Sequence, residues 1–144
     1  MTADTDPELT AAQQVLAAEH AAIYAYGVCG GVLDAGTPAA VRTLDGFTAH
    51  QTRRERLESL LRGRGLEPVA PSSGYALPGQ VTDAASAARL ARQVEDRCAV
   101  AYAALVGVAT GSTRRAAVGW LTDAATRGVG WGTAPSAFPG LQER

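Results

Sequence analysis

The sequence contains no lysine, so all 13 of its basic residues are arginine. Charge is scarce as well, because only 19% of the residues are charged and the formal net charge is −1. A protein that binds nucleic acid or an anionic membrane surface normally carries an excess of basic residues. We therefore expect neither nucleic acid nor a membrane among the partners of this chain.

A leader segment and long apolar runs are also missing. Met1 to Glu8 is polar and acidic, without the basic start and apolar run of a signal peptide. Polar residues interrupt the apolar stretches before the roughly 20 residues that a membrane-spanning helix needs. We therefore expect a cytoplasmic location. With 144 residues, 47% of them apolar, residues 1–144 are expected to form a single domain around one core.

Cysteine is rare, and the common catalytic motifs are absent. Cys29 and Cys98 lie far apart in sequence, inside predicted helices. In a reducing compartment they are expected to be buried thiols that act as small apolar side chains; their redox state stays open. The sequence has no phosphate loop, dinucleotide fingerprint, Ser or Cys nucleophile motif, or zinc-ligand spacing.

Capping signals and apolar periodicity predict an all-α protein. Asp6-Pro7 and Thr37-Pro38 pair a capping side chain with a proline suited to the first helical turn. Either Thr82 or Asp83 can cap a further helix. The four predicted helices span about residues 7–35, 38–62, 83–109 and 112–131.

The connections between these helices predict the topology. Short turns join the first helix to the second and the third to the fourth, so each pair forms an antiparallel hairpin. The segment 63–82 contains Pro68, Pro71 and Pro78 and is predicted to be a crossover loop. At about 3.3 Å per residue it is long enough to return along the whole bundle. Two hairpins joined in this way predict a ferritin-like four-helix bundle. The tail 132–144 is expected to be extended, with Phe138 docked on the bundle.

Four polar residues occupy or border the predicted core stripes. Glu19 lies between Leu16 and Ile23 in the seven-residue repeat of the first helix, and His50, Glu95 and Asp123 lie near the middle of the others. These four side chains can therefore share one layer of the bundle. Buried carboxylates need cations or hydrogen bonds, because burying them unpaired is costly.

A dinuclear metal centre is one way to satisfy these carboxylates. Such a site takes a Glu from each of two helices and a Glu-x-x-His from each of the other two. Glu19 and Glu95 fit the single positions. The other helices depart from the pattern, because Phe47 precedes His50 by three residues and Thr126 follows Asp123 by three. A degenerate iron or manganese site formed by these four ligands is thus the alternative hypothesis, and it implies a redox or metal-binding protein.

The preferred interpretation places arginines where the metal would lie. Arg53, Arg54 and Arg127 are each within about one turn of His50 or Asp123, and Arg97 follows Glu95 by two residues. A guanidinium can bridge two carboxylates by paired hydrogen bonds. This predicts a metal-free bundle with a buried carboxylate–arginine network. In a third interpretation these residues flank the seam and their charged ends reach solvent.

Several stretches also resemble a known family, the ferritin-like domains of unknown function from high-GC Gram-positive bacteria. These stretches are AAEHAAIYAYGV (17–28), HxxRRExL (50–57), YALPGQVTDAASAARLA (75–91), VEDRCAVAYAALV (94–106), LTDAATR (121–127) and AFPG (137–140). The resemblance implies the bundle fold. It implies no established activity and supplies no catalytic residues.

Three functions remain open from the sequence. The favoured one is a structural or interaction module, which we expect to be a homodimer and not an enzyme. The second is the redox or metal-binding protein described above. The third is a small-ligand binder with a pocket between the crossover and the bundle, and the aromatic residues that can line such a pocket are Tyr24, Tyr26, Tyr75, Tyr102 and Trp120.

Overall fold

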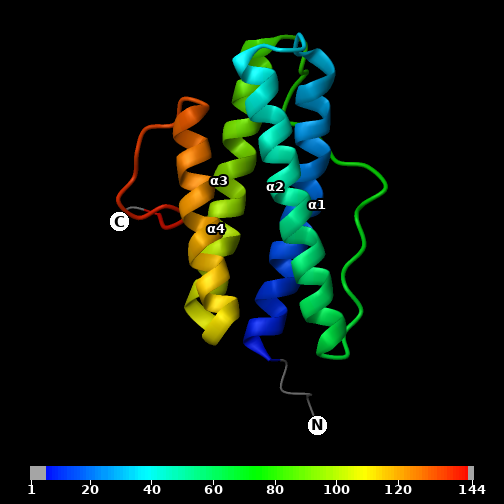
Figure 1. Ribbon diagram of the computed structural model, residues 1–144, viewed down its shortest axis with the longest axis vertical. Coiled ribbons are helices and arrows are strands. Elements are labelled where there is room, and N and C mark those ends of the chain that lie inside the picture. Colours follow the sequence, from blue (N-terminus) through cyan, green and yellow to red (C-terminus); the bar gives the residue numbers. More distant parts are fainter. Residues whose placement is uncertain (1–5, 143–144) are drawn as a thin grey trace.

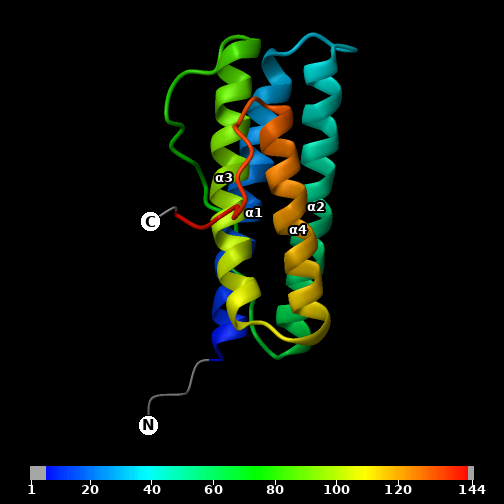
Figure 2. The ribbon, with the colours of Figure 1, turned by 90° about the vertical axis from the view of Figure 1, so that its left-hand side faces the viewer.

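The computed structural model describes residues 6–142 and contains four helices (Figure 1). These helices are α1 (Pro7–Val32), α2 (Pro38–Gly63), α3 (Ala84–Val108) and α4 (Gly111–Gly130). Helices α1 and α2 form one antiparallel hairpin, and α3 and α4 form the other. The loop after α2 runs back along the length of the bundle, as Figures 1 and 2 both show. The predicted all-α bundle of two hairpins joined by a long crossover is confirmed.

The helix starts follow from the predicted caps. The side chain of Asp6 accepts a hydrogen bond from the backbone N–H of Glu8, and that of Thr37 accepts one from Ala40. Asp83 and Ser86 form a reciprocal capping box at the start of α3. Most helix ends lie within one residue of the prediction. The exception is α1, which ends at Val32 instead of 35.

The early end of α1 comes from the turn that follows it. Leu33 leaves the helix with an extended backbone, at φ −99° and ψ 139°. Gly36 then adopts φ +80°, a left-handed conformation that residues with a Cβ rarely take. The chain therefore uses four residues, 33–36, to reverse direction before the Thr37 cap. The predicted turn is shorter.

The packing of the helices is uneven. Helix α1 packs closely on both α2 and α3, and α3 packs on α4, whereas α2 and α4 share no comparable backbone contact. Helices α1 and α3 are thus the central pair, each contacting two neighbours. The remaining space between α2 and α4 has to be spanned by long side chains.

The sequence pattern predicts a buried face of α2 made of Phe47, His50, Arg54, Leu57 and Leu61, and this face is correct at its centre and wrong at its edge. His50 and the two leucines are buried. Phe47 is only half-buried, and the Arg54 guanidinium pairs with a surface glutamate while Arg53 takes the inward position. Successive residues are about 100° apart around a helix, so two adjacent arginines cannot both point into the same seam.

Helix α1 is the one helix of residues 6–142 whose length and hydropathy would suit a membrane span. In this fold it is a core helix. Its buried residues include Leu16, Tyr26 and the carboxylate of Glu19, and its two neighbours are α2 and α3.

The crossover, residues 64–83, is held along the bundle by polar contacts. The Gln13 side chain donates to the carbonyl of Glu67 at 2.7 Å and accepts from the N–H of Val69 at 2.8 Å. The rings of Tyr24 and Tyr75 pack in a tilted arrangement, with their centroids 5.2 Å apart and an interplanar angle of 41°. These contacts fix the loop to α1 on the side away from α4.

The C-terminal tail is attached differently from the prediction. Phe138 was expected to dock, but 67% of it is exposed. The attachment is made instead by Gly140, which lies at φ +77° so close to α3 that an added Cβ would be 2.3 Å from the carbonyl oxygen of Ala99. Only a residue without a side chain permits this approach. The buried Trp131 holds the other end of the tail.

The first testable prediction concerns Gly46, where an added Cβ would lie 2.6 Å from the ring of Tyr26. That ring is fully buried and hydrogen-bonded, so it cannot move aside freely. We expect Gly46→Ala to lower the free energy of unfolding by about 1–3 kcal/mol, measured by urea denaturation.

The matched control for Gly46 is Gly119, a helical glycine on α4 with open space around its missing Cβ. Gly119→Ala should stabilise the protein by up to about 1 kcal/mol, because alanine has the higher helix propensity. Stabilisation by both substitutions would contradict the close contact between Gly46 and Tyr26.

Candidate functional site

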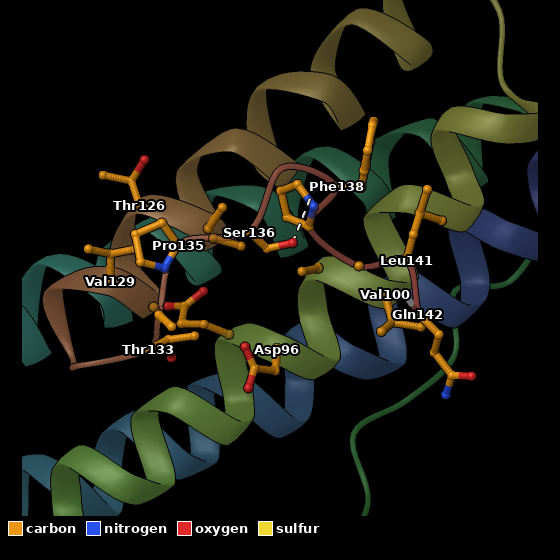
Figure 3. Close-up of a pocket in the computed structure, with 18 residues that line it drawn as sticks. Asp96, Val100, Thr126, Val129, Thr133, Pro135, Ser136, Phe138, Leu141 and Gln142 are labelled. Carbon is orange, nitrogen blue, oxygen red and sulfur yellow. Dashed lines mark hydrogen bonds between the residues drawn. The ribbon is translucent and has the colours of Figure 1, made fainter. Parts of the chain in front are cut away.

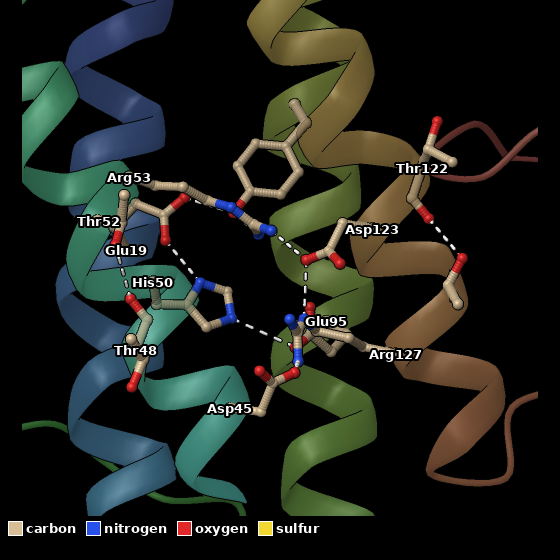
Figure 4. A network of polar contacts seen from close by, with 12 residues as sticks. Glu19, Asp45, Thr48, His50, Thr52, Arg53, Glu95, Thr122, Asp123 and Arg127 are labelled. Carbon is tan, nitrogen blue, oxygen red and sulfur yellow. Dashed lines mark hydrogen bonds and ion pairs between the residues drawn. The ribbon is translucent and has the colours of Figure 1, made fainter. Parts of the chain in front are cut away.

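Three buried polar side chains from three helices meet at the centre of the bundle (Figure 4). The ring of His50 on α2 lies between Glu19 on α1 and Glu95 on α3. Its Nδ1 is 2.6 Å from Glu19 Oε2, and its Nε2 is 3.3 Å from Glu95 Oε1. All three residues are at most 1% exposed. One imidazole therefore connects a carboxylate of each hairpin.

Two tyrosines satisfy the same carboxylates in a crossed arrangement. The hydroxyl of Tyr26 on α1 donates to Glu95 on α3 at 2.5 Å, and that of Tyr102 on α3 donates to Glu19 on α1. In each helix the tyrosine follows the glutamate by seven residues, or two turns. Because α1 and α3 run antiparallel, each tyrosine lies beside the glutamate of the other helix.

A chain of ion pairs leads from this centre toward the surface. Arg53 donates to the hydroxyl of Tyr102 at 3.0 Å and to the carboxylate of Asp123 on α4. Arg127 donates from Nε to Asp123 and from Nη1 to Asp45 on α2, both at 2.7 Å. Figure 4 shows these side chains crossing the space between α2 and α4. They make the contact that the two helix backbones lack.

Two tryptophans cover the ends of the network. The indole N–H of Trp131 donates to the hydroxyl of Tyr26 at 3.1 Å. The ring of Trp120 packs on Tyr102 at a centroid separation of 5.8 Å, and the Arg53 guanidinium lies 5.4 Å from the centre of the same tyrosine ring. These rings exclude water from the buried hydrogen bonds, which strengthens them.

The electrostatics follow from burial and pairing. Burial alone would lower the pKa of His50, but its hydrogen bonds with Glu19 and Glu95 outweigh burial and raise that pKa from 6.5 to about 9. At neutral pH the ring is therefore protonated, and both nitrogens donate. Burial raises the pKa of Asp123, yet Arg127 and Arg53 more than compensate and hold the pKa below its usual value.

The comparisons with known proteins identify the family. The sequence profile of a domain of unknown function, DUF4439, matches residues 11–143. The chain belongs to this family. It is similar in structure to a conserved hypothetical protein of Mycobacterium tuberculosis, Rv2844, with a TM-score of 0.82 and 34% sequence identity. The likeness covers 90% of this chain and 97% of the mycobacterial chain. No curated protein matches the sequence.

The residues predicted for the site are only partly brought together in this DUF4439 domain. Glu19, His50 and Glu95 converge, while Asp123 is joined to them only through Arg53 and Tyr102. Among residues 6–142, no group of three or more His, Cys, Asp or Glu side chains is arranged to hold a metal ion. Iron or manganese binding stays a prediction.

Only some of the predicted arginines belong to the network. Arg53 and Arg127 belong to the network, as expected. Arg54 does not, because its guanidinium pairs with Glu55 at 3.4 Å, and Arg97 is exposed. The reason for Arg54 is that its neighbour Arg53 takes the inward position on α2, so Arg54 points away from the interior.

Sequence reasoning missed the tyrosines as hydrogen-bond donors to the carboxylates. The signal was present, since Glu19 and Tyr26 have the same spacing as Glu95 and Tyr102. Two buried glutamates on antiparallel helices, each followed by a tyrosine two turns later, predict the crossed pairs. Asp45 was missed because its contact with Arg127 depends on how α2 faces α4.

The predicted aromatic pocket exists, but only two of the five predicted aromatic residues line it. Tyr24 and Tyr75 line a cavity of about 140 Å³ between the crossover, α1 and α3. Tyr26 and Tyr102 belong to the central network instead, and Trp120 lies between α2 and α4. Both cysteines are buried and free, as expected, and burial raises the pKa of the Cys29 thiol to about 11.

The second prediction tests the crossed hydrogen bonds. Tyr26→Phe and Tyr102→Phe should each lower the free energy of unfolding by about 1–3 kcal/mol, because each leaves a buried carboxylate with one donor fewer. Urea denaturation measures this change. The control is Tyr24→Phe on a ring that is 41% exposed, which should change stability by at most about 0.5 kcal/mol. Equal, small effects at all three positions would contradict the arrangement.

The third prediction concerns pH. His50 has a pKa of about 9 in the folded state against 6.5 when unperturbed, so its protonation stabilises the folded state fully below pH 6.5. This contribution is lost as pH rises through about 9. Between about pH 7 and pH 9.5 the free energy of unfolding should therefore fall by roughly 2 kcal/mol from this group.

The control for the pH dependence is His50→Gln, which keeps a polar side chain without a titrating ring. Chemical denaturation of both proteins across the same pH range, with chelator present, isolates the histidine. The difference in stability between them should shrink as pH rises. A difference that stays constant would mean that His50 is neutral in the folded protein.

Proposed function

We propose that this DUF4439 domain is a metal-free helical bundle with a structural or interaction role, in which the buried network joins the two hairpins. The observation that carries this proposal is that His50 uses both ring nitrogens on carboxylates of different hairpins. Glu19 belongs to the α1–α2 hairpin and Glu95 to the α3–α4 hairpin. Every helix contributes a side chain, since Arg53 extends the network to Asp123 on α4.

The donor set supports the absence of a metal because its coordinating atoms are already engaged. A histidine ligand needs a free lone pair on one ring nitrogen, whereas both nitrogens of His50 face carboxylates. Glu19 accepts from Tyr102 at Oε1 and from His50 at Oε2. Asp123 Oδ2 accepts from two arginines. A bound metal would have to displace most of these hydrogen bonds.

The second candidate is a dinuclear iron or manganese protein. Two features favour it. The crossover connectivity is that of ferritin-like proteins, which supports the proposed ferritin-like relationship. In addition, Glu95 Oε2 is buried without a hydrogen-bond partner among residues 6–142. One buried carboxylate oxygen without a hydrogen bond is far fewer ligand atoms than a dinuclear centre uses.

Elemental analysis is the fourth prediction and decides between the two. Protein purified without chelators should contain less than about 0.1 iron or manganese ion per chain, also after incubation with Fe²⁺ or Mn²⁺, because the ligand atoms are occupied. A content of about two ions per chain, with a matching visible spectrum, would establish the metal protein instead.

Glu19→Gln provides the variant for this comparison. In the metal-free network it should lower the free energy of unfolding by about 2–4 kcal/mol, since His50 loses a charged partner, and leave the metal content unchanged. In a metal protein it should remove metal. Light scattering of the same preparations tests the homodimer, which stays a prediction.

A further inference from the structure

A cavity of about 380 Å³ lies between α3, α4 and the C-terminal tail (Figure 3). Asp96 and Val100 border it from α3, and Thr126 and Val129 from α4. The tail covers it, because Gly140 is fixed against α3 as described above. Cavities of this size are typical of sites for small molecules.

The inner wall of this cavity includes Glu95, which links it to the central network. Glu95 Oε1 accepts from Tyr26 and faces His50. The second oxygen, Oε2, is buried and has no hydrogen-bond partner among residues 6–142. Buried carboxylate oxygens are nearly always hydrogen-bonded, and leaving one unmatched is costly. Because Glu95 is among the residues that line this cavity, a ligand in it would approach the Glu95 carboxylate from this side.

The charge of the site determines whether the ligand carries a positive or a negative charge. The lining of the cavity contains two acidic residues, Glu95 and Asp96, and no basic one. In the network itself, the four carboxylates of Glu19, Asp45, Glu95 and Asp123 face three cations, namely protonated His50 and two arginines. The arrangement is one positive charge short, so the site favours a cationic ligand over an anionic one.

The rest of the lining sets the shape and polarity of the ligand. The walls are small apolar side chains, among them Ala99, Val129 and Pro135, with hydroxyl groups from Thr126, Thr133 and Ser136. A ligand with a compact apolar body fits against these small apolar side chains. A charged N–H group can donate to Glu95 and to a neighbouring hydroxyl or to Asp96.

We propose that this cavity binds a small organic ammonium ion, whose N–H group donates to Oε2 of Glu95 and whose apolar body lies between α3, α4 and the tail. This site is separate from the metal-free role proposed above, because it uses the buried carboxylate oxygen of Glu95 to which no group of residues 6–142 donates. A ligand here would complete the hydrogen bonding of Glu95.

The fifth prediction uses three probes of one shape and different charge. Benzylamine is a cation at neutral pH, benzyl alcohol is neutral and benzoate is an anion. In calorimetric titration of the full chain, benzylamine should bind at least about tenfold more tightly than the other two. In NMR spectra its amide shifts should centre on Ala99, Val129 and Thr133, which line the cavity. Equal affinity for all three probes, or no saturable benzylamine binding up to about 20 mM, would overturn the proposal.

Two pairs of variants locate the site. Glu95→Gln should weaken benzylamine binding by about tenfold or more, whereas Glu55→Gln, at an exposed position of α2, should leave it unchanged. The second pair does not disturb the network. Thr126→Trp fills the cavity from the surface of α4 and should abolish binding. Thr122→Trp, one turn away and equally exposed, should have no effect. Unchanged binding in Thr126→Trp would overturn the assignment, even if Glu95→Gln fails to fold.

Mn²⁺ alone serves as the last probe. Saturable Mn²⁺ binding that needs Glu95 and excludes benzylamine would overturn the ammonium site and the metal-free role together. Failure of benzylamine to bind, with no metal present, would overturn the ammonium site alone. The two proposals are therefore distinguishable.

Discussion

The hydrogen bonds of His50 to Glu19 and Glu95 are the interaction on which the interior depends. Removing two carboxylates from water costs several kcal/mol each unless charge and hydrogen bonds replace the lost hydration. A protonated imidazole between them provides charge to both and one donor to each. Because the two glutamates belong to different hairpins, satisfying them requires the hairpins to meet in one register.

The uneven packing of the bundle follows from this centre. Helices α1 and α3 exchange hydrogen bonds through their glutamates and tyrosines and lie close together. Helices α2 and α4 are joined by long side chains, through the ion pairs of Arg53 and Arg127 and through Arg56 over the ring of Trp120. The contacts between α1 and α3 and those between α2 and α4 differ in their exposure to water. The buried hydrogen bonds act in a low-dielectric, water-excluded interior, and the outer ion pairs are partly solvated, where such pairs contribute little to stability. The first set of contacts specifies the fold, and the second fills the remaining seam with polar groups.

The cavity beside Glu95 gives the same carboxylate a second role. One of its oxygens faces His50 and accepts from Tyr26, and the residue also lines a cavity that the tail borders. Since the tail is fixed through Gly140, the enclosure depends on the AFPG stretch near the C-terminus, which the sequence already marked as distinctive. In this chain the structural role of Glu95 and ligand binding in the cavity are tested separately by variants at Glu95 and at Thr126.

Sequence alone determined the helices, their caps, the two hairpins and the polar residues of the core, because these depend on local periodicity and on the cost of burying charge. It also predicted that Glu19, His50, Glu95 and Asp123 can share one layer; the first three meet directly, and Asp123 is reached through Arg53. Tertiary structure decided the rest. The sequence does not say which of the adjacent residues Arg53 and Arg54 points inward, because this depends on how α2 is oriented about its own axis. The Asp45–Arg127 pair likewise depends on how α2 faces α4. The pocket depends on where the tail lies, and that is set by the approach of a glycine to the backbone of α3, a contact between residues distant in the sequence.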